Sequence, residues 1–226
     1  EAERDKAVAE RRRANLQATT TRAVVDFLQN DLLKVANTTV QADRGVATPT
    51  RDIKVREALD RAAASIGDRF QNQPEVEAEI RNTIGETYFN LNILPMAKEQ
   101  LEAAYALRKK SLGPLHPDAL QSLHGIGMVL RADGKSAEAV ELFRQVVAGR
   151  QRAFGAEDRR TLQAMHSVAV ALRSSGKAEE ARDLHANVLA VRKRVLGLED
   201  PDTMRSFNDL GVAYIYSSQA EAGLPL

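Results

Sequence analysis

Two histidines, His124 and His166, are the residues whose type and spacing first suggest chemistry. They stand 42 residues apart, and imidazole serves proteins as a metal ligand and as an acid–base group. If the chain repeats at that interval, both lie on adjacent helices about 8–10 Å apart, close enough to share an ion. A third ligand is missing from the pattern. We therefore expect a polar ladder of side chains, with no metal site and no cofactor.

Other catalytic patterns are absent from the sequence. There is no cysteine, which excludes disulfides, thiolate metal sites and cysteine catalysis. Gly125-Ile126-Gly127 lacks the third glycine and the preceding strand of a dinucleotide site, and no kinase, hydrolase or metalloprotease motif occurs. We expect His116 to cap a helix and His185 to be a packed, hydrogen-bonded core residue. The sequence thus predicts that this chain is not an enzyme.

The elements that must position these residues recur along the chain. Small residues repeat with a period of 42 at Ala97, Ala139, Ala181 and at Gly113, Gly155, Gly197. A fixed period of this size is typical of a solenoid. One unit begins with apolar and small residues on one helical face, at Leu123, Ile126, Gly127 and Leu130, and continues with Ala139 and Phe143. This pattern predicts stacked pairs of helices, in which Gly127 lets the second helix approach closely.

The spacing L-x2-[apolar]-G-x2-L followed by A-x3-F resembles the tetratricopeptide repeat. The turn Leu112-Gly113 followed by His116-Pro117-Asp118 comes after an Arg- and Lys-rich helix, and it resembles the repeats of the kinesin light chain class. The resemblance covers roughly residues 75–226. It implies an all-α fold, a right-handed α-solenoid of helical hairpins with about three full repeats and a truncated fourth.

The chain divides into four expected segments. Residues 1–36 predict a charged and then amphipathic helix, which packs on the first repeat or acts as a coiled coil or partner helix. Residues 37–52 are a polar linker, residues 53–73 a helix that caps the stack, and residues 74–226 the repeats. Because the sequence lacks an initiator Met and ends inside a repeat, we interpret it as a piece of a longer protein.

Two short strings near the N-terminus carry a second resemblance. Residues 23–33 and residues 52–63 look like the segment that joins a membrane helix to the repeats in many bacterial serine/threonine protein kinases. The resemblance implies a non-catalytic docking or sensory tail, with the kinase domain and the membrane helix upstream. If a membrane helix precedes residue 1, the repeats lie outside the cytoplasm. Without such a helix, we expect them in the cytoplasm.

The charges of the chain balance. Lys and Arg number 32 against 31 Asp and Glu, which gives no overall field for nucleic acid. We expect the basic residues of the second helices to form a solvated convex edge, namely Arg108, Lys109, Arg150, Arg152, Arg192 and Arg194. Any partner attracted by charge must therefore meet a local patch.

The first helices of a tetratricopeptide stack line its concave face. The polar residues expected there form a candidate peptide-binding groove: Asn82, Glu86, Gln121, His124, Arg131, Gln163, His166, Arg173 and Asn208. Amides and imidazoles suit an extended peptide backbone, and guanidinium groups suit carboxylates. The alternative interpretation is a solvated polar face. A further function remains open, namely self-association through the open apolar face of residues 201–226.

Overall fold

Eight α-helices make up residues 55–217, the part of the chain that the computed structural model describes, and no strand occurs there. In chain order they are α3 (Val55–Arg69), α4 (Pro74–Asn90), α5 (Leu94–Leu112), α6 (Pro117–Ala132), α7 (Ser136–Phe154), α8 (Arg159–Ser174), α9 (Ala178–Val195) and α10 (Pro201–Tyr216). The prediction of an all-α solenoid is confirmed. The helix and linker predicted within residues 1–52 lie outside the described range.

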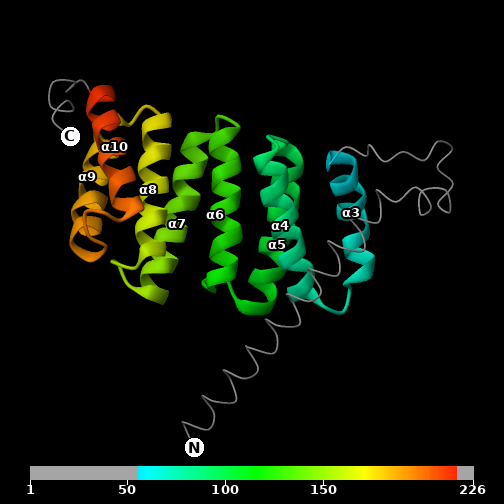
Figure 1. Ribbon diagram of the computed structural model, residues 1–226. Helices are drawn as coiled ribbons and strands as arrows, with labels where there is room; N and C mark the ends of the chain where they lie inside the picture. The colour runs from blue at the N-terminus through cyan, green and yellow to red at the C-terminus, as the bar shows by residue number, and fades with distance from the viewer. Residues whose placement is uncertain (1–54, 218–226) are drawn as a thin grey trace, which may run out of the picture.

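The helices stack in the order of the sequence (Figure 1), with α3 at one end of the row and α10 at the other. Each helix packs against the next, so α4 with α5, α6 with α7 and α8 with α9 form three hairpins. The first helices α4, α6 and α8 also contact one another across hairpins. We call the outer surface of α4, α6, α8 and α10 the first-helix face. Between residues 55 and 217, no helix is both long and apolar enough to cross a membrane.

The helix boundaries follow from residues at repeated positions. His116, Asp158 and Asp200 each cap a first helix, and their side chains accept a hydrogen bond from the backbone N–H two residues later. This confirms the capping role predicted for His116, whose Nδ1 lies 3.3 Å from the amide nitrogen of Asp118. Gly113, which follows α5, has a φ of 94°. That left-handed conformation favours glycine and sets the direction of the turn.

Small residues allow the two helices of a hairpin to approach closely. Ala97, Ala139 and Ala181 are all fully buried at equivalent places in the second helices, as the period predicts. At Gly127 on α6, an added Cβ atom would lie 2.6 Å from the ring of Phe143 on α7. Phe143 is itself completely buried. The aromatic ring therefore occupies the space that any larger residue at position 127 would need.

One prediction about the second helices was wrong in part. Lys109, Arg152 and Arg194 are exposed, as predicted for a solvated edge. Arg108, Arg150 and Arg192 are instead buried. Each Nη1 group donates a hydrogen bond to a backbone carbonyl ten residues later, at 3.0, 2.7 and 3.0 Å respectively. The three arginines are one period apart. Each faces the first turn of the first helix that follows it in the chain. The pattern of charges alone could not show this, because a neighbouring hairpin supplies the acceptors.

We predict opposite tolerances at two glycines of α6. Gly127→Ala should lower the free energy of unfolding by about 1–3 kcal/mol, because the new methyl overlaps the Phe143 ring. Gly125→Ala is the control, since its Cβ would lie 3.1 Å from the flexible end of Leu101. The gain in helix propensity, about 1 kcal/mol, should offset that contact. Urea unfolding followed by circular dichroism measures both, and equal losses would contradict this account of the packing.

Candidate functional site: the first-helix face

The nine predicted groove residues all lie on first helices, but they differ in exposure. Those that are exposed to solvent are Glu86, Gln121, Gln163 and Asn208, and those that are partly buried are His124, Arg131, His166 and Arg173. Asn82 is buried, with only 2% of its surface exposed. The row Asn82, His124, His166 and Asn208 is therefore not a uniform surface ladder.

Asn82 on α4 is used inside the protein. Its Oδ1 accepts hydrogen bonds from Ser122 Oγ at 2.9 Å and from Arg108 Nη1 at 3.1 Å. Its Nδ2 donates to Glu86 Oε1 at 2.8 Å, and Gln121 Nε2 reaches the same oxygen at 3.4 Å. All the polar atoms of the Asn82 side chain thus have protein partners. Asn82 positions α4 against α6 and leaves Glu86 and Gln121 to face outward.

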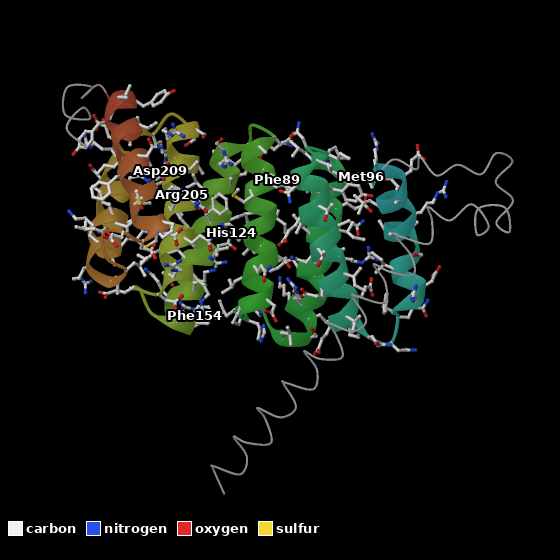
Figure 2. The ribbon with its side chains drawn as sticks, viewed as in Figure 1. Phe89, Met96, His124, Phe154, Arg205 and Asp209 are labelled. Carbon is white, nitrogen blue, oxygen red and sulfur yellow. The ribbon has the colours of Figure 1, made fainter. Side chains whose placement is uncertain are left out.

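His124 on α6 also bridges two first helices. Its Nε2 lies 2.9 Å from Ser167 Oγ on α8, and its ring packs against Phe143 with a centroid distance of 5.1 Å. Burial, with smaller contributions from Arg150 and His166, lowers the pKa of His124 to about 4. The imidazole is therefore neutral at physiological pH. Figure 2 shows His124 within the row of first helices.

Arg131 on α6 and Arg173 on α8 occupy equivalent positions one period apart. The guanidinium group of Arg131 makes no hydrogen bond or ion pair with any residue between 55 and 217. Within the same range, the guanidinium group of Arg173 lies over the ring of Tyr216, with its Cζ 5.3 Å from the ring centroid, and makes no hydrogen bond or ion pair. Two guanidinium groups on adjacent first helices therefore lack a carboxylate partner among the described residues. Such groups can bind carboxylates of another molecule.

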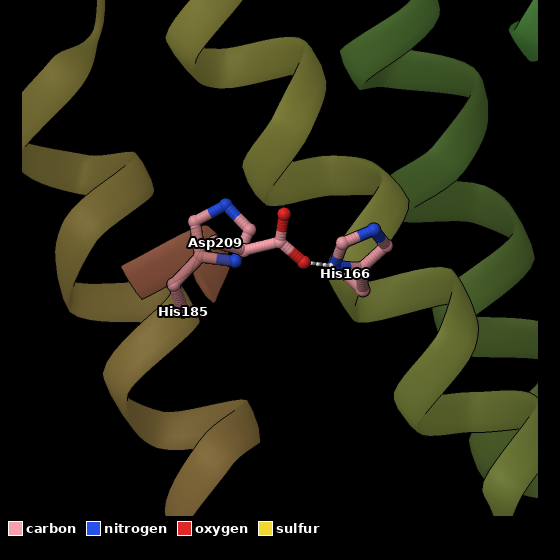
Figure 3. Close-up of side chains that lie close together, drawn as sticks. All are labelled: His166, His185 and Asp209. Atoms are coloured by element: carbon pink, nitrogen blue, oxygen red, sulfur yellow. Dashed lines mark ion pairs between the residues drawn. The ribbon is translucent and has the colours of Figure 1, made fainter. Parts of the chain in front are cut away.

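A second cluster lies where α8, α9 and α10 meet. Figure 3 shows His166, His185 and Asp209, one from each helix, with their polar atoms turned toward one another. His166 Nδ1 and Asp209 Oδ2 are 3.5 Å apart, and the two imidazole centroids are 5.5 Å apart. The pKa values of both histidines fall to about 4, chiefly through burial. Both rings are thus neutral at physiological pH.

This cluster corrects two sequence expectations. The pattern paired His166 with His124 and supplied no third ligand, but the structure places His166 beside His185 and Asp209. The prediction that His185 is buried is confirmed, whereas the expected hydrogen bond is absent from its Nδ1 among the described residues. Asp209 was missed because its neighbours come from other repeats. Aligning the repeats column by column would have drawn attention to it, since Ser167 occupies the equivalent position.

The opposite side of the stack has a hollow that the sequence did not indicate. It has a volume of about 500 Å³ and lies between α7 and α9, with α8 at its base. Its apolar lining includes Val147, Met165 and Leu184, and an ion pair of 3.5 Å between Arg144 and Glu180 borders it. The second helices thus diverge where the first helices touch.

Comparisons with known proteins agree with this architecture. Family models of the tetratricopeptide repeat match residues 76–152 and residues 161–202. Two crystal structures of nearly identical TPR-like repeats, designated a kinesin light chain of Podosopora anserina, are similar at 25% identity, with TM-scores of 0.68 and 0.66. These alignments cover 88% of this chain and 90% of theirs.

The crystal structure of BtubC (BKLC) from P. vanneervenii is also similar, with 18% identity and a TM-score of 0.66. That alignment covers 92% of this chain and 86% of BtubC, and it shows a common fold. A search of curated proteins gave no significant match.

We predict that His124 makes stability depend on pH. The unfolded chain binds a proton at position 124 below pH 6.5, whereas the folded chain does so only near pH 4. The contribution of a neutral His124 is therefore complete above pH 6.5 and is lost as pH falls toward 4. Between pH 7 and 4.5 the free energy of unfolding should fall about 2 kcal/mol more for the unchanged chain than for His124→Asn.

The His124→Asn variant carries the residue that occupies the equivalent position in the first repeat, Asn82. Urea titrations at both pH values measure the difference. His166 and His185 titrate in the same direction in both chains, so their contribution cancels in the comparison. An identical fall in both chains would show that His124 takes up no extra proton on unfolding.

Proposed function

The chain carries tetratricopeptide repeats, and we propose that it is a protein-interaction module that binds an extended acidic peptide on its first-helix face. Repeats of this kind generally mediate protein–protein interactions. The peptide is a free ligand or an exposed segment of a partner protein. The proposed contact surface is centred on α6 and α8.

The observation that carries this proposal is the pair Arg131 and Arg173. Both side chains are partly buried and therefore partly exposed to solvent. Neither has a carboxylate partner within residues 55–217. Repeats stacked about 10 Å apart match the distance between residues i and i+3 of an extended peptide. The pair therefore suits a peptide with acidic residues three positions apart.

Neighbouring amides suit the backbone of the same peptide. Gln121 and Gln163 are exposed and occupy equivalent positions on α6 and α8. Each amide side chain can donate to a peptide carbonyl and accept from a peptide N–H. Glu86 on α4 is negative and already bonded to Asn82 and Gln121. We therefore propose that the site for the acidic peptide ends at α4, because the negative charge of Glu86 repels the peptide there.

We also propose, from the resemblance of residues 23–33 and 52–63 to bacterial kinase tails, that the repeats dock a partner of a signalling kinase. Residues 23–33 lie outside the described range, and residues 56–63 belong to α3. The proposal predicts a kinase domain upstream in the gene that encodes the chain. It adds a cellular role and does not alter the site proposed on α6 and α8.

A second candidate function is self-association through α10. Three large apolar residues of this helix are exposed, with Met204 at 62%, Ile215 at 57% and Tyr216 at 64%. Stacking neighbours normally cover the apolar face of a terminal helix in a solenoid. A second copy of the chain can supply that neighbour.

We predict that Arg131→Glu combined with Arg173→Glu leaves the fold intact and weakens binding of acidic peptides more than about tenfold. The probe is an array of 12-residue peptides with two Asp or Glu residues at all spacings, and fluorescence anisotropy measures the affinities of those that bind. The physical reason is the replacement of two attractions by two repulsions. Spacing i, i+3 should bind best.

The control is Lys110→Glu combined with Arg152→Glu, which changes the net charge equally. Both residues are exposed and lie on the second helices α5 and α7. This control should retain binding. Unchanged affinity after Arg131→Glu and Arg173→Glu, or an equal loss in both double variants, would remove the proposed site.

Self-association predicts a molar mass that rises with protein concentration. Light scattering coupled to size exclusion measures it, and Ile215→Glu with Tyr216→Ser should return the chain to a monomer, because these changes make the exposed face of α10 polar. A constant monomer mass for the unchanged chain would exclude the second candidate and leave the peptide site unaffected.

A further inference from the structure

The cluster of His166, His185 and Asp209 holds three polar atoms without a hydrogen-bond partner. Among the described residues, His166 Nδ1, His185 Nδ1 and Asp209 Oδ2 are buried and make no hydrogen bond, although His166 Nδ1 and Asp209 Oδ2 face each other at 3.5 Å. The His185 residue is 98% buried, with 2% of its surface exposed. Buried polar atoms are nearly always hydrogen-bonded, so three unpaired atoms in one place require an explanation. A bound cation would satisfy all three.

The spacing of the cluster suits a transition metal ion. One ligand atom from each residue lies within 4.8 Å of the other two. In a tetrahedral zinc site with bonds of about 2.1 Å, ligand atoms are about 3.4 Å apart. His166 Nδ1 and Asp209 Oδ2, at 3.5 Å, already have this separation. Rotation of the side chains that moves the ligand atoms by about an ångström would bring the remaining separations, at most 4.8 Å, to that of a zinc site.

Comparison of the repeats shows what is special about this place. In the preceding repeat the equivalent positions hold His124, Phe143 and Ser167. The ring of His124 packs against Phe143, and its Nε2, rather than Nδ1, lies 2.9 Å from Ser167 Oγ. In the last described repeat, phenylalanine is replaced by His185 and serine by Asp209. Both replacements introduce metal-ligating side chains into an unchanged framework. The earlier cluster has one possible nitrogen ligand and serves as an internal reference.

From these observations we propose that His166, His185 and Asp209 form a binding site for one divalent first-row transition metal ion, with zinc the best fit. Two imidazole nitrogens and one carboxylate oxygen are ligands that zinc prefers. Magnesium and calcium prefer sets of oxygen ligands, and this cluster contains a single carboxylate. A fourth coordination position remains for water or a side chain of a partner.

Charges of both signs surround the cluster. The guanidinium groups of Arg131, Arg173, Arg192 and Arg205 act on the two histidines, and the carboxylates of Asp202 and Asp209 oppose them. The buried Arg192 donates through Nη1 to the Asp202 carbonyl and to Ser206 Oγ, while its Nε has no hydrogen-bond partner among the described residues. Arg205 is exposed and is paired with Asp202 at 3.9 Å. The carboxylate of Asp209 therefore remains available to neutralise part of the charge of the ion.

A bound ion would link three consecutive helices. His166 belongs to α8, His185 to α9 and Asp209 to α10. α10 packs against α9 and lies at the end of the described stack (Figure 1). Metal binding would therefore hold the α8–α9 hairpin against α10, and it should raise the stability of this end of the solenoid.

The test uses the full chain, freed of any affinity tag and stripped with a chelator, and titrates it with Zn²⁺ alone by isothermal calorimetry. We expect one ion per chain and a midpoint of thermal unfolding that rises with Zn²⁺ concentration. Co²⁺ should give the visible absorption of a site with four ligands. The double variant His185→Phe with Asp209→Ser restores the residues of the preceding repeat, so it should fold while Zn²⁺ affinity falls at least about a hundredfold.

His124→Asn is the matched control, since it removes a histidine at the equivalent position and should retain Zn²⁺ binding. His116→Asn removes the exposed cap histidine and should also retain it. The proposal is overturned if the folded, stripped chain binds no Zn²⁺. It is also overturned if the folded double variant binds as tightly as the unchanged chain, or if His116→Asn abolishes binding.

Discussion

A buried arginine that reaches from one hairpin to the next is the interaction on which the stack depends. Arg108, Arg150 and Arg192 each donate to a backbone carbonyl in the first turn of the following first helix. Hydrogen bonds with a charged donor contribute about 1.5–3 kcal/mol. Because the donor and acceptor keep the same separation along the chain, each hairpin is set on the previous one in the same way. The regular stacking of the hairpins and the first-helix face follow from this repetition.

The constant framework allows the same position to take different roles. Asn82, His124 and His166 occupy equivalent places on α4, α6 and α8. Asn82 accepts hydrogen bonds from Arg108 and Ser122, His124 pairs with Ser167, and His166 faces His185 and Asp209. What changes is the residue supplied by the next hairpin. The contacts made at this one position therefore change from repeat to repeat, while the buried alanines and the glycine turns recur.

The two proposed sites occupy neighbouring parts of this framework. The peptide site uses Arg131 and Arg173, whose guanidinium groups lack carboxylate partners among the described residues. The metal site uses buried atoms that lie behind the first-helix face. Arg131 contributes to the electrostatic environment of His166, and Arg173 to that of His185. A charge added at either site will therefore be felt at the other.

The sequence by itself determined the period, the helical hairpins, the cap at His116 and the buried alanines at positions 97, 139 and 181. These features depend on spacing within one repeat, which the order of residues records directly. The burial of Arg108 and Asn82, the hollow between α7 and α9, and the meeting of His185 with Asp209 were decided by the tertiary structure. Each involves atoms of adjacent hairpins, and the rise and twist between hairpins arise only when their side chains pack.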